Sequence, residues 1–123
     1  MVRALAASTQ KRLRKRLEDE RARLEGLIGE FENERQAARL AETSADHAPD
    51  AENTDGGSLA YELELELSAY NNAVELLAKV NHALSRMDRG LYGICEVSGD
   101  RIPVARLDAL PYATTTVEWA HRV

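Results

Sequence analysis

A long run of helix-forming residues decides the fold: residues 59–91 read LAYELELELSAYNNAVELLAKVNHALSRMDRGL. One row of this run repeats every seven residues, at Leu63, Tyr70, Leu77, Leu84 and Leu91. A companion row begins with Leu67 and Val74 and becomes polar at Asn81 and Asp88. Sevenfold spacing of apolar residues predicts a helix with a narrow apolar seam, as in a coiled coil. We predict this helix over about residues 59–89, with the two polar positions fixing register at its base.

A matching segment lies upstream, from about Thr9 to Ala41. Its sevenfold row is Leu17, Leu24, Phe31 and Ala38, and Leu13 and Leu27 supply much of the companion row. Two seams of similar length each need an apolar partner, and packing on one another satisfies both. We therefore predict a mainly α fold built on a long antiparallel coiled-coil hairpin, with arms about 45 Å long at 1.5 Å per residue.

The stretch between these segments, about residues 42–58, has no large apolar residue and contains Pro49 and the pair Gly56-Gly57. Such a composition predicts a polar loop at the tip of the hairpin. Ser58 is a suitable N-cap for the second helix.

The composition restricts the classes of function. The chain has 123 residues, a formal net charge of -5, 5% aromatic residues and one cysteine. Few aromatic residues and a rod-like hairpin argue against a deep substrate pocket, and we expect no catalysis. No apolar run is long enough to span a membrane, and the N-terminus lacks the apolar core of a secretory signal. One cysteine forms no internal disulfide, so a cytoplasmic location is expected.

Charge is distributed unevenly along the chain. Residues 1–23 hold eight basic and three acidic residues, whereas residues 24–75 hold thirteen acidic residues and only two basic ones, a net charge of -11. The basic stretch is interpreted as a solvated helix face, and nucleic-acid binding through it is the alternative. The acidic stretch favours a basic or cation-rich partner surface.

Periodicity ends after residue 89. Arg89-Gly90 is typical of a helix C-terminus, Val97-Ser98-Gly99-Asp100 of a tight turn, and Val104–Leu110 of a short helix ended by Pro111. Residues 90–123 are predicted to form a small globular knob, and residues 1–89 the N-terminal segment and coiled coil. A knob of this size is too small to fold without support from the hairpin, a bound metal or a disulfide.

Residues 91–114 read LYGICEVSGDRIPVARLDALPYAT. They resemble the zinc-finger stretch of the DksA/TraR family, YGxCxxxGxxIPxxRLxAxPxAxxC, which in that family follows a long antiparallel coiled coil. The match includes Ile102-Pro103, Arg106-Leu107 and Ala109. The resemblance in layout covers essentially the whole chain, and the detailed motif about 25 residues.

The family's four zinc ligands are spaced Cys-x2-Cys-x17-Cys-x2-Cys. These positions fall on Cys95, Ser98, Thr116 and Trp119. Zinc requires four nitrogen, sulfur or carboxylate donors, and only the cysteine qualifies. We therefore expect a degenerate module that binds no zinc, with Cys95 packed as a remnant and Val117 and Trp119 filling the space.

The resemblance implies a transcription regulator that binds RNA polymerase directly. In the family, the coiled coil enters the polymerase's secondary channel, and acidic residues at its tip alter the stability of promoter complexes. The family's tip motif, Asp-x-x-Asp-x-Ala, falls on residues 52–57. Asp55 matches the second aspartate and Glu52 replaces the first; Asp50 and Asp46 are substitutes if the register differs.

Some family members also bind the alarmone (p)ppGpp at the junction of coil and knob. Leu76 and Lys79 fall on matching positions, whereas Leu110 and Ala120 occupy two positions that are basic in that pocket. Loss of two cations argues against synergy with a polyphosphate.

A second interpretation belongs to another class: a coiled-coil adaptor or oligomerisation protein that no longer binds polymerase. For the polymerase-binding regulator we expect a monomer, without sequence-specific nucleic-acid binding or membrane association.

Overall fold

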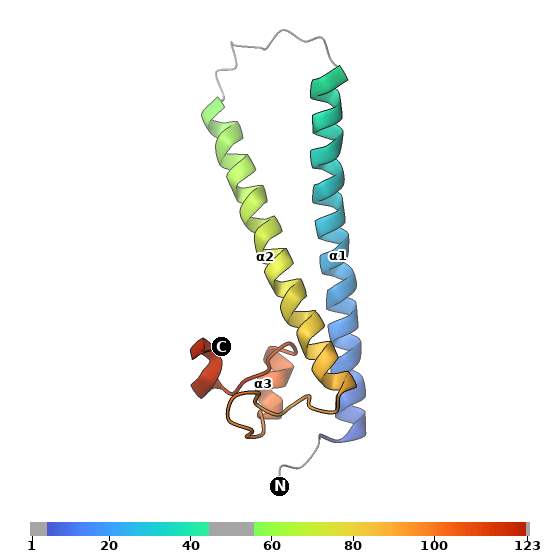
Figure 1. Ribbon diagram of the computed structural model, residues 1–123, viewed down its shortest axis with the longest axis vertical. Coiled ribbons are helices and arrows are strands. Elements are labelled where there is room, and N and C mark those ends of the chain that lie inside the picture. The colour runs from blue at the N-terminus through green and yellow to red at the C-terminus, as the bar shows by residue number, and fades with distance from the viewer. Residues whose placement is uncertain (1–4, 45–55, 123) are drawn as a thin grey trace.

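Two long helices form an antiparallel hairpin with a small C-terminal knob beside its base (Figure 1). The computed structural model describes residues 5–44 and 56–122. Helix α1 spans Ala7–Ser44 and α2 spans Gly56–Asp88. The knob holds the short helix α3 (Val104–Ala109) and the 3₁₀ helix η1 (Val117–Arg122). The predicted helical hairpin is confirmed.

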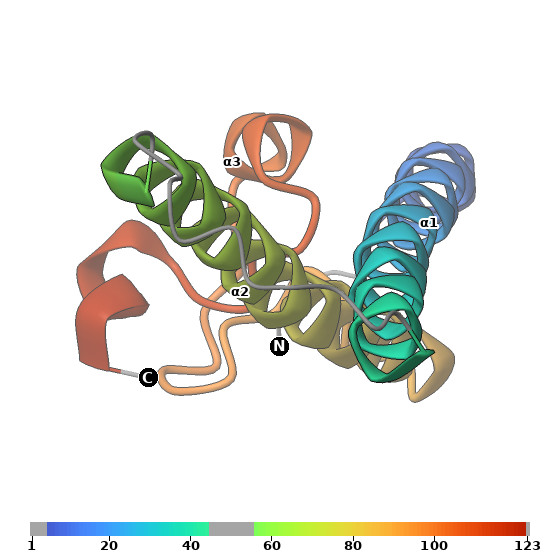
Figure 2. The same ribbon diagram turned by 90° about the horizontal axis from the view of Figure 1, so that it is seen from above.

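The core lies at the base of the hairpin. Leu13, Leu17 and Leu24 of α1 are at most 2% exposed, and they belong to one buried cluster with Val80 and Leu84 of α2. The two helices diverge toward the tip (Figures 1 and 2). On the distal half of α2 the seam residues Leu63 and Leu67 remain 38% and 37% exposed. The predicted seams therefore pack from the base up to the stacked rings of Phe31 and Tyr70, whose centroids are 4.6 Å apart, and not along the whole hairpin.

The predicted companion row of α2 was wrong. Asn81 and Asp88 are exposed, whereas Ala73, Val80 and Met87 are buried. In a heptad repeat, a row can be paired with the row three or four residues further on. Here the row at plus three, which stays apolar to the end of the helix, faces α1. Asn81 and Asp88 consequently cannot fix register inside the seam.

The hairpin arms extend further into the predicted loop than expected. Helix α1 continues to Ser44, and α2 begins at Gly56, so Ser58 lies within the first turn and not at the N-cap. The following leucines and glutamates are strong helix formers, which accounts for a helix that starts despite two glycines. The predicted tip acids Asp46, Asp50, Glu52 and Asp55 lie outside the described residues.

Helix α2 ends at a Schellman motif, as Arg89-Gly90 predicted. Gly90 has a φ of +75°, the Leu91 N–H donates to the Arg86 carbonyl at 2.8 Å, and the Gly90 N–H donates to the Met87 carbonyl at 3.1 Å. The chain then makes the predicted turn, in which Gly99 has a φ of +79° and Ile94 pairs with Arg101 in one antiparallel bridge.

The basic residues of α1 bind other parts of the chain. Arg12 forms an ion pair with Asp108 of α3 at 2.6 Å, and Arg14 forms one with Asp88 of α2 at 2.9 Å. Arg16 donates to the Asp108 carbonyl at 2.6 Å. These groups are partly exposed, so each pair contributes little alone. Together they clamp the base, and much of the basic stretch is thereby used within the molecule.

None of the helices in the described ranges combines the length and apolarity needed to cross a bilayer.

Candidate functional site

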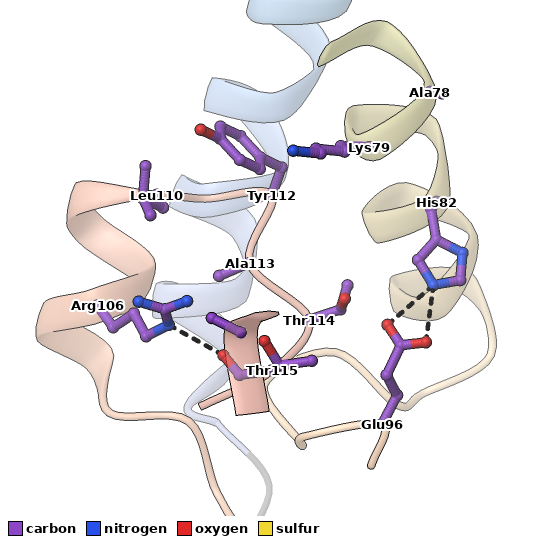
Figure 3. A pocket seen from close by; sticks show the side chains of 11 residues that line it. Ala78, Lys79, His82, Glu96, Arg106, Leu110, Tyr112, Ala113, Thr114 and Thr115 are labelled. Carbon is purple, nitrogen blue, oxygen red and sulfur yellow. Dashed lines mark hydrogen bonds and ion pairs between the residues drawn. The ribbon is translucent and has the colours of Figure 1, made fainter. Parts of the chain in front are cut away.

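A cavity of about 470 Å³ lies at the junction of α2 and the knob (Figure 3). Helix α2 contributes Ala78, Lys79 and His82, and the knob contributes the opposite wall. The knob residues that line it are Glu96, Arg106, Leu110, Tyr112, Ala113, Thr114, Thr115 and Ala120.

The charged groups of this cavity are largely engaged with the protein. His82 Nε2 lies 3.1 Å from a carboxylate oxygen of Glu96, and Arg106 Nε donates to the Thr115 carbonyl at 2.9 Å. Burial raises the pKa of Glu96, but hydrogen bonds with Thr114 and His82 outweigh it, so the pKa lies below its usual value. The carboxylate is therefore ionised at neutral pH and opposes a bound anion.

The two predicted nucleotide positions are placed differently. Lys79 lines the cavity, and so do Leu110 and Ala120, the positions at which cations are missing. Leu76 is partly buried against the hydrophobic core and is not among the lining residues. With Glu96 facing it and Arg106 already donating to a carbonyl, this cavity has little capacity for a polyphosphate. Both positions stay predictions.

Cys95 occupies the first of the four ligand positions in the zinc-finger motif that the sequence resembles. The residue is 1% exposed. The Ser98 N–H donates to the sulfur at 3.5 Å, and the Thr116 hydroxyl lies 3.9 Å from it. Burial raises the pKa of the thiol, but hydrogen bonds from Ser98, Thr116 and Val97 outweigh this and lower the pKa to about 6. Hydrogen-bond donors thus surround a sulfur that is closed off from solvent.

This donor set does not fit zinc. In the described ranges 5–44 and 56–122, no three His, Cys, Asp or Glu side chains come together in a way that could hold a metal ion. Ser98 and Thr116 direct hydrogen-bond donors at the sulfur, and a neutral hydroxyl is a poor zinc ligand. Trp119 packs partly buried against the core, as expected, whereas Val117 is 63% exposed and fills no space, contrary to the expectation.

Several residues that hold the knob escaped the sequence analysis. Arg86, 9% exposed, donates to the carbonyls of Leu91 and Ile94 at 3.3 and 2.8 Å. The Tyr92 hydroxyl donates to the Pro111 carbonyl at 2.8 Å, and burial raises the pKa of Tyr92 to about 12, so the donor persists at neutral pH. The signal available for Arg86 was its place in the last turn of a helix that ends at glycine.

Leu5 closes the knob from the N-terminal side. It is 7% exposed and packs over Gly93, which has a φ of +87°. A β-carbon at Gly93 would lie 2.8 Å from Leu5 Cδ1. Leu5 is therefore part of the knob's core.

Comparisons with known proteins agree with this architecture. Residues 90–118 match the model of the prokaryotic dksA/traR C4-type zinc finger. The chain is 35% identical over 91 residues to the RNA polymerase-binding transcription factor DksA of Caulobacter vibrioides, covering 74% of this chain and 62% of that protein. It is 57% identical over 44 residues to General stress protein 16O of Bacillus subtilis, covering 36% of this chain and 27% of that protein.

The structure of transcription factor DksA2 from Pseudomonas aeruginosa matches with a TM-score of 0.67 and 29% identity. The match covers 94% of this chain and 83% of that one. The chain spans less than two thirds of the length of both curated relatives. The zinc-finger motif, the helical hairpin and the structural match along nearly the whole chain agree. This protein is a member of the DksA/TraR family.

Proposed function

We propose that this protein regulates transcription by binding RNA polymerase directly and inserting the acidic end of its hairpin into the secondary channel. The observation that carries the proposal is the match of hairpin and knob together to the DksA2 structure, over 94% of this chain. The relative from Caulobacter is named for binding RNA polymerase, which supports the same partner here.

The charge distribution supports insertion of the distal end first. Residues 24–75 carry a net charge of -11, and the described glutamates of the distal arms, such as Glu34, Glu62 and Glu64, are exposed. A rod with a concentrated negative end is attracted into a basic, cation-containing channel. In this mechanism the protein positions carboxylates near the polymerase's own catalytic centre and performs no chemistry itself.

Competition tests the partner and its site. Labelled full-length protein is titrated with core RNA polymerase, and an established secondary-channel factor is then added. Displacement by that factor is expected, because both rods occupy one channel. Absence of binding by folded protein would contradict the proposal and favour the adaptor interpretation.

Asp55→Asn is expected to abolish the effect on promoter-complex lifetime while changing polymerase affinity less than about threefold. The reason is that one tip carboxylate adds little to total binding but supplies the charge that acts at the active centre. Open-complex half-life and competition binding measure the two effects. Asp100→Asn, which removes the same charge from the exposed turn of the knob, is the matched control. Equal activity of Asp55→Asn and the wild-type chain would remove the tip mechanism.

We also propose that the knob folds without zinc. The Cys95 sulfur is held by hydrogen bonds, and the remaining ligand positions supply no good donor. Purified protein is expected to contain far less than one zinc per chain, and a strong chelator should leave its melting temperature unchanged, because metal binding contributes no folding free energy. Stoichiometric zinc by elemental analysis, or unfolding by the chelator, would contradict this proposal.

A further inference from the structure

The distal half of the hairpin contains an apolar groove that no segment within residues 5–44 and 56–122 covers. A cavity of about 250 Å³ is lined by residues of both α1 and α2. The two helices diverge toward the tip of the hairpin (Figure 1). Its apolar lining is Leu27, Phe31, Ala69, Tyr70 and Ala73. At its centre the Phe31 and Tyr70 rings stack with centroids 4.6 Å apart.

Exposed leucines extend this groove toward the tip. Leu59 and Leu63 of α2 are 52% and 38% exposed. Leu63 lies on the heptad row of Tyr70 and the buried Leu84, so it continues the face that packs on α1 lower down. The opposing stretch of α1, residues 32–42, contains one large apolar residue, Leu40, which is itself 61% exposed. Helix α1 therefore has too few apolar side chains to cover this face.

The rim of the groove is acidic. Glu30 and Glu34 of α1 and Glu66 of α2 line it, and no basic residue does. Arg35 is not a lining residue, and its guanidinium carbon lies over the Phe31 ring, 6.0 Å from the ring centroid. A second copy of this chain would bring a segment of net charge -11 toward the same rim, and like charges oppose that contact.

We propose that this groove binds an amphipathic helix of another protein whose apolar stripe is flanked by lysine or arginine. Apolar side chains at helical spacing enter the groove between Leu27 and Tyr70, and the basic flanks pair with Glu30, Glu34 and Glu66. The inference goes beyond polymerase binding, because it concerns the side of the hairpin and needs no tip residue.

Synthetic helices test the groove without polymerase, so the result does not depend on the proposed function. The probe is a fluorescent amphipathic Leu/Lys peptide of about 18 residues, long enough to form a helix. Two comparison peptides are a scrambled sequence of the same composition and an amphipathic Leu/Glu helix. Anisotropy with the full-length chain, at about 0.15 M salt, is expected to show saturable binding of the Leu/Lys helix only.

Matched variants assign the binding to the groove. Leu27→Gln/Leu63→Gln changes exposed apolar side chains of the groove, and Val97→Gln/Val117→Gln changes exposed apolar side chains of the knob. The triple variant E30Q/E34Q/E66Q removes the rim charge, and E25Q/E75Q/E118Q removes the same charge from exposed positions elsewhere.

Each groove variant is expected to weaken binding about tenfold, and each control less than about twofold. Equal losses in groove variants and controls would overturn the proposal, as would equal binding of the scrambled peptide, because net charge alone would then explain the affinity. Failure of the Leu/Lys helix to bind folded wild-type protein would overturn it as well. Circular dichroism of each variant confirms that the hairpin has formed.

Discussion

Gly93→Ala is expected to lower the free energy of unfolding by about 3 kcal/mol and the melting temperature by roughly 10 °C. Two effects combine. Gly93 has a φ of +87°, a conformation that L-residues adopt at a cost of about 1–2 kcal/mol. In addition, the new β-carbon would lie 2.8 Å from Leu5 Cδ1 in a packed core, which costs about 1–3 kcal/mol more. Thermal and denaturant unfolding measure the change.

The two effects can be separated with variants of the same chain. Gly99 has a similar φ of +79°, but a β-carbon there meets nothing within 4 Å, so Gly99→Ala is expected to lose only the backbone contribution. Introducing Gly93→Ala into a Leu5→Ala background removes the overlap and should reduce the loss to that of Gly99→Ala. A Gly93→Ala loss no larger than that of Gly99→Ala in the wild-type background would show that Leu5 does not pack on this glycine.

Arg86→Leu is expected to lower the free energy of unfolding by about 3 kcal/mol, because two carbonyls lose a charged donor. The guanidinium is 9% exposed and links the end of α2 to Leu91 and Ile94 at the start of the knob. Loss of these bonds should release the knob before the hairpin. Trp119, which packs against the core from η1, reports knob unfolding by fluorescence, and far-ultraviolet circular dichroism reports the hairpin.

Two further variants make this prediction specific. Arg89→Leu removes the same charge from an exposed position three residues further on, and is expected to change stability by less than about 0.5 kcal/mol. Arg86→Lys keeps the charge but replaces the planar guanidinium, whose Nη2 donates to both carbonyls, by a shorter side chain with a compact ammonium, so it should restore part of the stability. Equal losses for Arg86→Leu and Arg89→Leu would mean that charge, and not the carbonyl contacts, explains the effect.

The hairpin could be predicted because its evidence is local. Sevenfold repeats around Leu17 and Leu84 define two helices, and short polar segments between helices favour antiparallel packing. The second row of α2 that packs on α1 could not be chosen from local sequence. Both the row three residues after the Leu84 row and the row four residues after it contain apolar residues. Val80 and Asn81 are adjacent in sequence, and only the position of α1 decides that Val80 is buried.

The opening of the hairpin was also beyond the sequence pattern. The leucines of α2 continue to Leu59, and this regularity suggested a closed seam along the whole length. The opposing polar run of α1, residues 32–42, was the signal that the seam cannot close. Comparing the apolar residues of the two helices at each opposing position would have located the point of divergence near Phe31 and Tyr70.

The candidate site was predicted in part. Lys79 was placed at the junction from the resemblance, and it does line the cavity. The contacts of Leu5 and Arg86 were not foreseen, because each depends on backbone atoms or residues far away in sequence. Every residue has a backbone carbonyl, so the amino-acid sequence does not indicate which carbonyls accept a hydrogen bond from an arginine. In the sequence, a buried arginine that binds carbonyls therefore looks like any basic residue near a helix end.

The clamp between Arg12 and Asp108 joins residues 96 positions apart, and Leu5 meets Gly93 across most of the chain. During synthesis the first turns of α1 leave the ribosome long before α3 exists, so their partners arrive last. Closing so long a segment costs conformational entropy that only the finished knob offsets. On the nascent chain Leu13 and Leu17 therefore lack their apolar partners until α2 has followed, and the base of the hairpin is completed last.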